Sequence, residues 1–267
     1  MVSIAVVNQK GGVGKTTVVL GLTSAAARRG IRTLVVDMDP QGNATTGLGV
    51  FEPTRSIDSV LVEERPGGLR ATVEPTGWTT GCEPLPMLAA SSPSLAVREA
   101  QLSTDPLGAQ DRLRLAMRGN DVPLVLIDCP PSLSLLTVNA LSAADTVLIP
   151  MQCEYYALEG LAALMNTVEQ IQETVNPNLQ VEGILRTMYD PRNSLTLDVS
   201  GQLSEYFGDK VYRAVIPRNV RLAEAPSYGV PALKYDRASK GAIAYLALAG
   251  EMVRRHGSKK TSAPVAV

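Results

Sequence analysis

The sequence predicts an α/β domain in which a doubly wound, mostly parallel sheet is flanked by helices. Apolar runs of strand length alternate with stretches of helical periodicity along most of the 267 residues. Such alternation is typical of parallel strands joined by helical crossovers. A glycine-rich loop follows the first apolar run, and two later runs end in aspartate. Those features belong at the carboxyl edge of an open α/β sheet, where ligands bind.

Seven strands and seven helices account for the alternation. Because 45% of the residues are hydrophobic but only 4% are aromatic, the core is expected to be aliphatic. The expected strands lie near residues 2–8, 32–38, 84–89, 123–128, 145–150, 181–188 and 211–216. The expected helices lie near residues 15–29, 92–102, 108–118, 134–142, 157–174, 195–207 and 238–256.

One domain over residues 1–256 contains all of these elements, and no repeat or linker divides it. The stretch 52–83 mixes proline, glycine and scattered charge, and we expect it to decorate the sheet edge. Residues 257–267 are polar and end in small residues, so we expect a disordered C-terminal tail.

The overall composition favours a cytoplasmic protein. Its net charge is −1, from 25 basic and 26 acidic residues, so the whole chain carries no electrostatic signature of nucleic-acid binding. The N-terminus does not resemble a signal peptide, and no apolar run is long enough to span a bilayer. Three cysteines without C-x-x-C spacing fit unpaired thiols in a reducing compartment.

The heptapeptide Lys-Gly-Gly-Val-Gly-Lys-Thr, residues 10–16, predicts a site for a nucleoside triphosphate. Glycines let backbone N–H groups approach phosphate oxygens, and a helix beginning near Lys15 directs its N-terminus at the anion. Lys15 is expected on the β- and γ-phosphates and the Thr16 hydroxyl on Mg²⁺. Gln9 stands where the usual consensus has glycine. The expected nucleotide-binding residues in this loop are Lys10, Gly11, Gly12, Val13, Gly14, Lys15, Thr16 and Thr17.

Lys10 is one lysine more than an ordinary phosphate loop contains, and taken alone it fits a solvated surface residue. In this spacing the heptapeptide resembles the deviant Walker A motif, K-G-G-x-G-K-[S/T], of the ParA/MinD group of P-loop NTPases. The resemblance implies that the nucleotide is ATP and that Lys10 reaches across a homodimer to the partner's phosphates. Such a second cation would offset charge that develops during phosphoryl transfer. Lys10 and Lys15 are therefore expected to be catalytic.

Carboxylates follow at two strand ends. Alternation places Asp37 and Asp39 on the same side of the strand that begins at Thr33. Asp128 ends a second apolar strand, in the arrangement that holds Mg²⁺ through water. The segment 37–43 resembles switch I of the same ATPases, which implies that Asp39 positions the attacking water. Asp37 and Asp128 are expected, with Thr16, on the magnesium side.

A basic cluster lies between residues 210 and 240, where seven basic and two acidic residues give a net charge of +5. Taken alone, such a cluster is typical of a solvated surface. However, residues 216–229 and 188–197 are similar to segments of the ParA/Soj partition ATPases. That similarity implies non-specific DNA binding by Arg192, Arg218 and Arg221, with Lys234 and Arg237 as weaker candidates. It also implies that Pro217 and Asn219 frame the adenine.

The resemblance extends from about residue 2 to residue 250 and implies a slow ATPase that dimerises with ATP. In that state it would bind non-specific double-stranded DNA and associate with the nucleoid. A ParB-like centromere-binding partner would stimulate hydrolysis and release, and so drive chromosome or plasmid segregation.

Three alternatives share the loop. A ParA-like positioner of another cargo, such as a carboxysome or a chemoreceptor cluster, differs only in its partner protein. A MinD-like membrane-site ATPase needs a C-terminal amphipathic helix with bulky apolar anchors, whereas residues beyond 257 contain no aromatic residue. An electron-transfer relative of nitrogenase iron protein needs cluster-binding cysteines, and Cys129 lies instead directly after Asp128.

Overall fold

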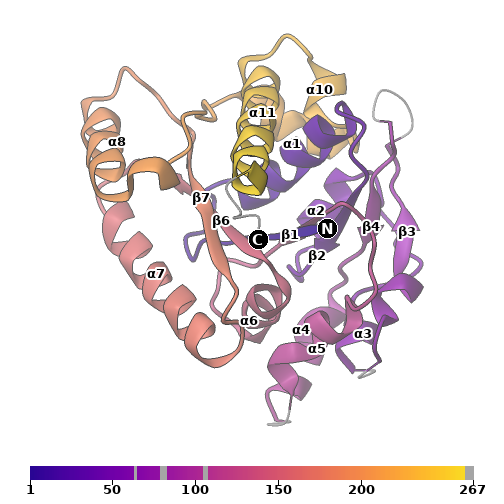
Figure 1. The fold of residues 1–267 in the computed structure, drawn as a ribbon. Helices are drawn as coiled ribbons and strands as arrows, with labels where there is room; N and C mark the ends of the chain where they lie inside the picture. Colours follow the sequence, from indigo (N-terminus) through magenta and orange to yellow (C-terminus); the bar gives the residue numbers. More distant parts are fainter. Residues whose placement is uncertain (63–64, 79–82, 105–107, 262–267) are drawn as a thin grey trace.

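A computed structural model describes residues 1–62, 65–78, 83–104 and 108–261 (Figure 1). Within these residues the sheet has seven strands in the order β3-β4-β2-β5-β1-β6-β7. All neighbours are parallel except β3 and β4, which confirms the mostly parallel, doubly wound sheet. The strands are β1 (Val2–Val6), β2 (Thr33–Asp37), β3 (Val73–Pro75), β4 (Met87–Ala89), β5 (Leu124–Asp128), β6 (Thr146–Gln152) and β7 (Gln180–Thr187).

Helices cover both faces of this sheet (Figure 1). The α-helices are α1 (Lys15–Ala27), α2 (Asn43–Gly47), α3 (Asp58–Val62), α4 (Ser94–Leu102), α5 (Arg112–Ala116), α6 (Leu135–Ala143), α7 (Ala157–Thr174), α8 (Ser194–Phe207), α9 (Val220–Glu224), α10 (Ala232–Tyr235) and α11 (Lys240–Thr261). Short 3₁₀ helices are η1 (Gly68–Ala71), η2 (Ala109–Asp111), η3 (Gly208–Lys210) and η4 (Ala225–Tyr228).

The strands bury residues on both faces, in two separate cores. In β5, Val125 and Ile127 belong to the core beneath α4, α5, α6 and α7, whereas Leu126 belongs to the core beneath α1 and α11. This division is why β5 and the other central strands are continuously apolar instead of alternating with polar residues.

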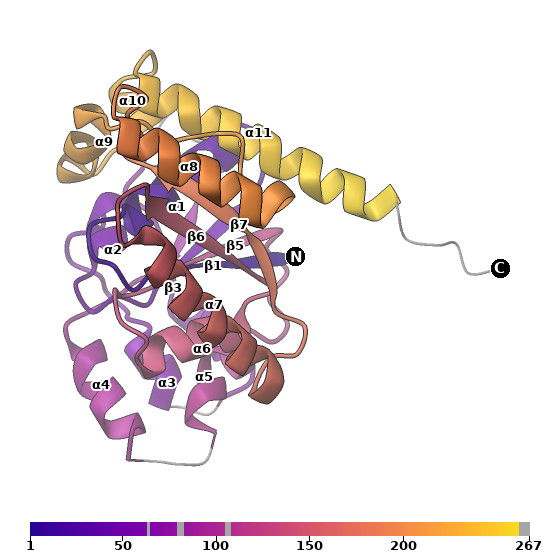
Figure 2. The same ribbon diagram turned by 90° about the vertical axis from the view of Figure 1, so that its left-hand side faces the viewer.

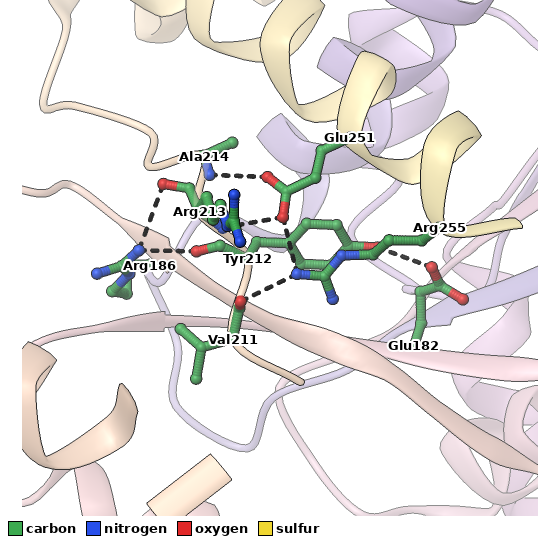
Figure 3. Close-up of polar contacts among 8 residues, drawn as sticks. All are labelled: Glu182, Arg186, Val211, Tyr212, Arg213, Ala214, Glu251 and Arg255. Atoms are coloured by element: carbon green, nitrogen blue, oxygen red, sulfur yellow. Dashed lines mark hydrogen bonds and ion pairs between the residues drawn. The ribbon is translucent and has the colours of Figure 1, made fainter. Parts of the chain in front are cut away.

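The segment 211–216 is not a strand, so that prediction was wrong. It runs extended beside β7, with the Tyr212 N–H donating to the Ile184 carbonyl at 2.9 Å. Side chains then replace the regular ladder, as Figure 3 shows. Arg186 donates to the Tyr212 carbonyl at 2.7 Å, and Glu251 of α11 accepts from the N–H groups of Arg213 and Ala214 at 3.0 and 2.9 Å.

In two regions the sequence patterns did not predict the secondary structure that the structure shows. The stretch 52–83 contributes α3, η1 and the short edge strand β3, in line with its expected place at the sheet edge. Its Trp78 is buried and donates from Nε1 to the Gly47 carbonyl at 3.0 Å. The final helix, α11, continues to Thr261, past residue 257 where we placed the start of the tail. Among the described residues, none of these helices has the length and apolar character needed to cross a bilayer.

Candidate nucleotide site and basic face

The glycine-rich loop joins the central strand β1 to α1. Gly12 and Gly14 adopt left-handed φ angles of 74° and 89°, which few other residues tolerate. No side chain caps the start of α1, so its first N–H groups are left for a ligand. A Cβ built on Gly12 would meet nothing within 4 Å. Glycine is therefore required here for the left-handed backbone conformation and keeps the space beside the loop open, and it does not relieve a close internal contact.

Side chains from neighbouring strands hold the loop from the sheet side. Thr187 at the end of β7 donates to the Val13 carbonyl at 2.7 Å, and Gln152 at the end of β6 donates to the Gly12 carbonyl at 3.0 Å. Asn8 donates to a carbonyl in β6 at 2.7 Å. The bonds from Thr187 and Gln152 fix two loop carbonyls against the sheet, and the bond from Asn8 ties the start of the loop to β6. Sequence reasoning missed all three side chains, and the only available signal was their place at strand ends.

Two adjoining cavities open beside the loop. The first, of about 620 Å³, combines the loop with Asp39, with α2 and with residues 222–227. The second, of about 320 Å³, is more apolar and is lined by Pro217, Arg218 and Asn219. The structure thus brings Pro217 and Asn219 beside the loop, and their contact with adenine stays a prediction.

A larger cavity, of about 800 Å³, lies at the amino end of β7 between α7 and α11. Its wall includes Glu182, Arg213 and Glu251, which belong to the polar cluster of Figure 3. It contains no phosphate loop and lies at the opposite end of β7 from Thr187. We therefore expect the nucleotide in the two smaller cavities beside the loop.

Thr16 lines the first cavity, and its hydroxyl contacts the buried Asp128 carboxylate behind it. Thr16 donates to Oδ2 of Asp128 at 2.8 Å, and Oδ1 of this fully buried carboxylate has no hydrogen-bond partner within the described residues. Burial, and then the charge of Asp37, raise the pKa of Asp128 well above its usual range. Burial also lowers the pKa of Lys15. A divalent cation would relieve this accumulation of buried carboxylates.

This donor set suits Mg²⁺. Among the described residues there is no group of three or more His, Cys, Asp or Glu arranged to hold a metal. A magnesium ion here would take the Thr16 hydroxyl, phosphate oxygens and water as ligands, and Asp128 would hold one of these waters, as is usual at nucleotide sites. The magnesium role of Thr16 and Asp128 remains a prediction, and the unpartnered oxygen supports it.

Asp37 is engaged elsewhere in the fold. Its Oδ2 accepts from the N–H and the hydroxyl of Thr45 at 2.8 and 2.7 Å, so it ties the end of β2 to α2. Burial raises its pKa to about 6. Asp39 lines the first cavity with Lys15, and its Oδ1 accepts from the Gln41 N–H at 3.0 Å. The magnesium-side role of Asp37 and the water-positioning role of Asp39 stay predictions.

Lys10 does not line either cavity in the single chain. Its ammonium group forms an ion pair with Glu154, which follows β6, and both side chains are about half exposed. Lys10 must leave Glu154 before it can reach a nucleotide held by another subunit.

The predicted DNA-binding residues are all exposed and lie on the loops and short helices between β7 and α11. A bridge between Tyr189 and Pro217 brings the loop after β7 against the segment that leads into α9. Figure 2 shows α9 and α10 next to each other near the start of α11. We call this surface the arginine face and define it as Arg192, Arg218, Arg221, Lys234 and Arg237.

Two of the three cysteines, Cys129 and Cys153, are buried and unpaired, as expected. Burial raises the pKa of both thiols. Neither thiol is exposed where a second subunit could share a metal cluster with it. Cys82 lies outside the described residues.

Comparison with known proteins identifies the family. Residues 1–181 match the model of a family described as an AAA domain. The chain is 45% identical over 262 residues to the chromosome partitioning protein ParA of Caulobacter vibrioides, covering 97% of each. It is 47% identical over 253 residues to the sporulation initiation inhibitor protein Soj of Bacillus subtilis, covering 93% of this chain and 97% of Soj.

A solved structure of the same fold contains the expected cofactors, an ATP analogue and magnesium. Cobyrinic acid a,c-diamide synthase from Mycobacterium smegmatis, with a bound ATP analogue and magnesium, matches with a TM-score of 0.80 at 34% identity. The match covers 97% of both chains. Sequence identity is higher to the partition proteins. The chain belongs to the ParA/Soj family of chromosome-partitioning ATPases.

Proposed function

We propose that this chain hydrolyses ATP with Mg²⁺, dimerises in the ATP state and then binds double-stranded DNA without sequence preference. A ParB-like centromere-binding partner stimulates hydrolysis and release, and the cycle segregates a chromosome or plasmid. One observation carries the proposal: Arg218 of the arginine face lines the same cavity as Pro217 and Asn219, directly beside the phosphate loop. Nucleotide and DNA would therefore be bound by adjoining residues.

Each residue of the site has a role in this cycle. Lys15 neutralises the β- and γ-phosphates, and Thr16 and Asp128 hold Mg²⁺, which withdraws charge from the phosphates. Asp39 orients the attacking water. Lys10 exchanges Glu154 for the partner's phosphates and joins the two subunits.

Contact between α2 and η4 offers a route from nucleotide to DNA. The Asp37–Thr45 hydrogen bonds anchor α2 beside the first cavity. Just after α2, Gly49 packs so closely on Gly229 that a Cβ at Gly229 would lie 3.0 Å from the Gly49 Cα. A movement of α2 when the γ-phosphate is lost would thus press on η4, which follows α9 and its arginine.

The test is binding of a non-specific DNA duplex without nucleotide, with ADP, and with ATP plus Mg²⁺. We expect tight binding only with ATP, and loss of that binding in Arg218→Glu. The matched control is Arg32→Glu, which makes the same charge change at an exposed position at the amino end of β2. Absence of DNA binding in every state, or equal loss in both variants, would refute the proposed function.

A further inference from the structure

Two arginines of the arginine face are already bound to carboxylates of the same chain. Arg192 donates from Nε to Oδ1 of Asp190 at 2.9 Å and from Nη2 to Oδ2 at 2.7 Å. Arg221 donates from Nη1 to Oε2 of Glu224 at 2.9 Å, and its Nε lies 3.6 Å from Oδ2 of Asp236. In the free chain, Arg192 and Arg221 therefore each have a carboxylate partner.

The ion pair at Arg192 occupies the same N–H donors, on Nε and Nη2, that would bind a DNA phosphate. A guanidinium binds phosphate through two parallel N–H donors, the same geometry that it uses toward a carboxylate. Asp190 occupies both donors at once. The Arg192 side chain is otherwise 88% exposed, so its fork is accessible to a phosphate once Asp190 is displaced.

Glu224 is held in place by more than Arg221. The Tyr235 hydroxyl donates to the same Oε2 of Glu224 at 3.1 Å. The Tyr235 ring in turn stacks on Tyr228, with ring centroids 5.3 Å apart. These contacts link η4, α9 and α10, so the carboxylate is positioned by the fold beside Arg221.

We propose that Asp190 and Glu224 compete with DNA phosphates for Arg192 and Arg221, and thereby set the DNA affinity of the arginine face. The inference rests on the proposed function, since it presumes that this face binds DNA. Exposed ion pairs are weak, so phosphates can displace both carboxylates. The competition lowers the DNA affinity of each arginine face. A single face then binds DNA weakly, and strong binding needs two faces joined in a dimer.

The carboxylates remain charged under physiological conditions. Hydrogen bonds from Arg192 hold the pKa of Asp190 at about 2, and the hydrogen bond from Arg221 lowers the pKa of Glu224. The competition therefore persists throughout the neutral pH range and is relieved by phosphate, not by protonation.

The test compares wild type with Asp190→Asn, Glu224→Gln and the double variant. Affinity for a non-specific duplex is measured with ATP plus Mg²⁺ and without nucleotide, over a series of salt concentrations. We expect each substitution to raise affinity roughly threefold or more. The slope of log affinity against log salt should steepen by about one for each arginine released.

Glu205→Gln is the matched control, because it removes one exposed negative charge near the end of α8, outside the arginine face. Thermal unfolding midpoints verify that the variants are folded. If wild type binds DNA with ATP but the two variants gain no more than Glu205→Gln, the competition is refuted and the proposed function stands. Weaker binding by the variants would likewise overturn it. If wild type binds no DNA in any state, the proposed function fails and the inference falls with it.

Discussion

The phosphate loop and the arginine face differ in how far each is prearranged for its ligand. Lys15 and Thr16 begin α1, and Thr16 donates a hydrogen bond to the buried Asp128 at the end of β5, so this part of the candidate nucleotide site is formed without a ligand. Lys10, Arg192 and Arg221 are exposed and paired with carboxylates, so each would have to change partner to take its proposed role. The comparison indicates that the groups proposed to bind the nucleotide are fixed by the fold, whereas these three groups, proposed to contact a second subunit or DNA, are paired with carboxylates of their own chain.

The largest expected effect is at the fixed region. Lys15→Ala should weaken ATP binding by about 100-fold or more, because it removes charge-assisted hydrogen bonds to two phosphates. Calorimetric titration with an ATP analogue measures this. Lys10→Ala is the comparison, and it should retain near wild-type affinity, since Lys10 does not line the cavity. If Lys15→Ala and Lys10→Ala lost the same ATP affinity, the two regions would not differ in the way described above.

Asp39→Ala should bind ATP but hydrolyse it about 100-fold more slowly or worse, because the attacking water loses its orienting base. The ATP dimer should then persist on DNA. Single-turnover hydrolysis and DNA dissociation rates provide the measurement. Normal turnover in this variant would transfer the catalytic role to another group.

Lys10→Ala should remain monomeric with ATP, whereas Glu154→Gln should dimerise at least as readily as wild type, because it frees Lys10 from its in-chain partner. Light scattering with ATP plus Mg²⁺ measures the mass. Lys210→Ala, which also removes an exposed lysine, at the end of η3, is the control. A Lys10→Ala protein that still dimerised would contradict the assignment of Lys10.

The smallest expected effect is on ATP affinity, when a hydrogen bond that supports the phosphate loop is removed. Thr187→Val keeps the side-chain shape but removes the hydrogen bond to the Val13 carbonyl, at a cost of about 1 kcal/mol. ATP affinity should fall roughly fivefold. Thr167→Val, at a half-buried position of α7, removes a similar hydrogen bond to the Ala163 carbonyl and should leave ATP affinity unchanged. Unchanged affinity in Thr187→Val would mean that the loop needs no support from β7.

The sequence indicated candidate residues for the nucleotide site but not the side chains that support the loop, and the reason is physical. The loop and the aspartates at strand ends are contiguous motifs, so their order along the chain already specifies the site. Thr187 meets Val13 across 174 residues, and Lys10 meets Glu154 across 144, so no local pattern encodes either contact. The error at residues 211–216 has the same origin, since Glu251 of α11 takes the N–H groups that a strand would have paired.

The most direct test of a nucleotide-gated DNA-binding face is the salt dependence of DNA affinity in the presence and absence of ATP. With four to six phosphates neutralised in the ATP state, the log–log slope should be roughly −4 to −5. Without nucleotide, binding should be much weaker at every salt concentration. A slope near zero, or the same affinity with and without ATP, would contradict the account.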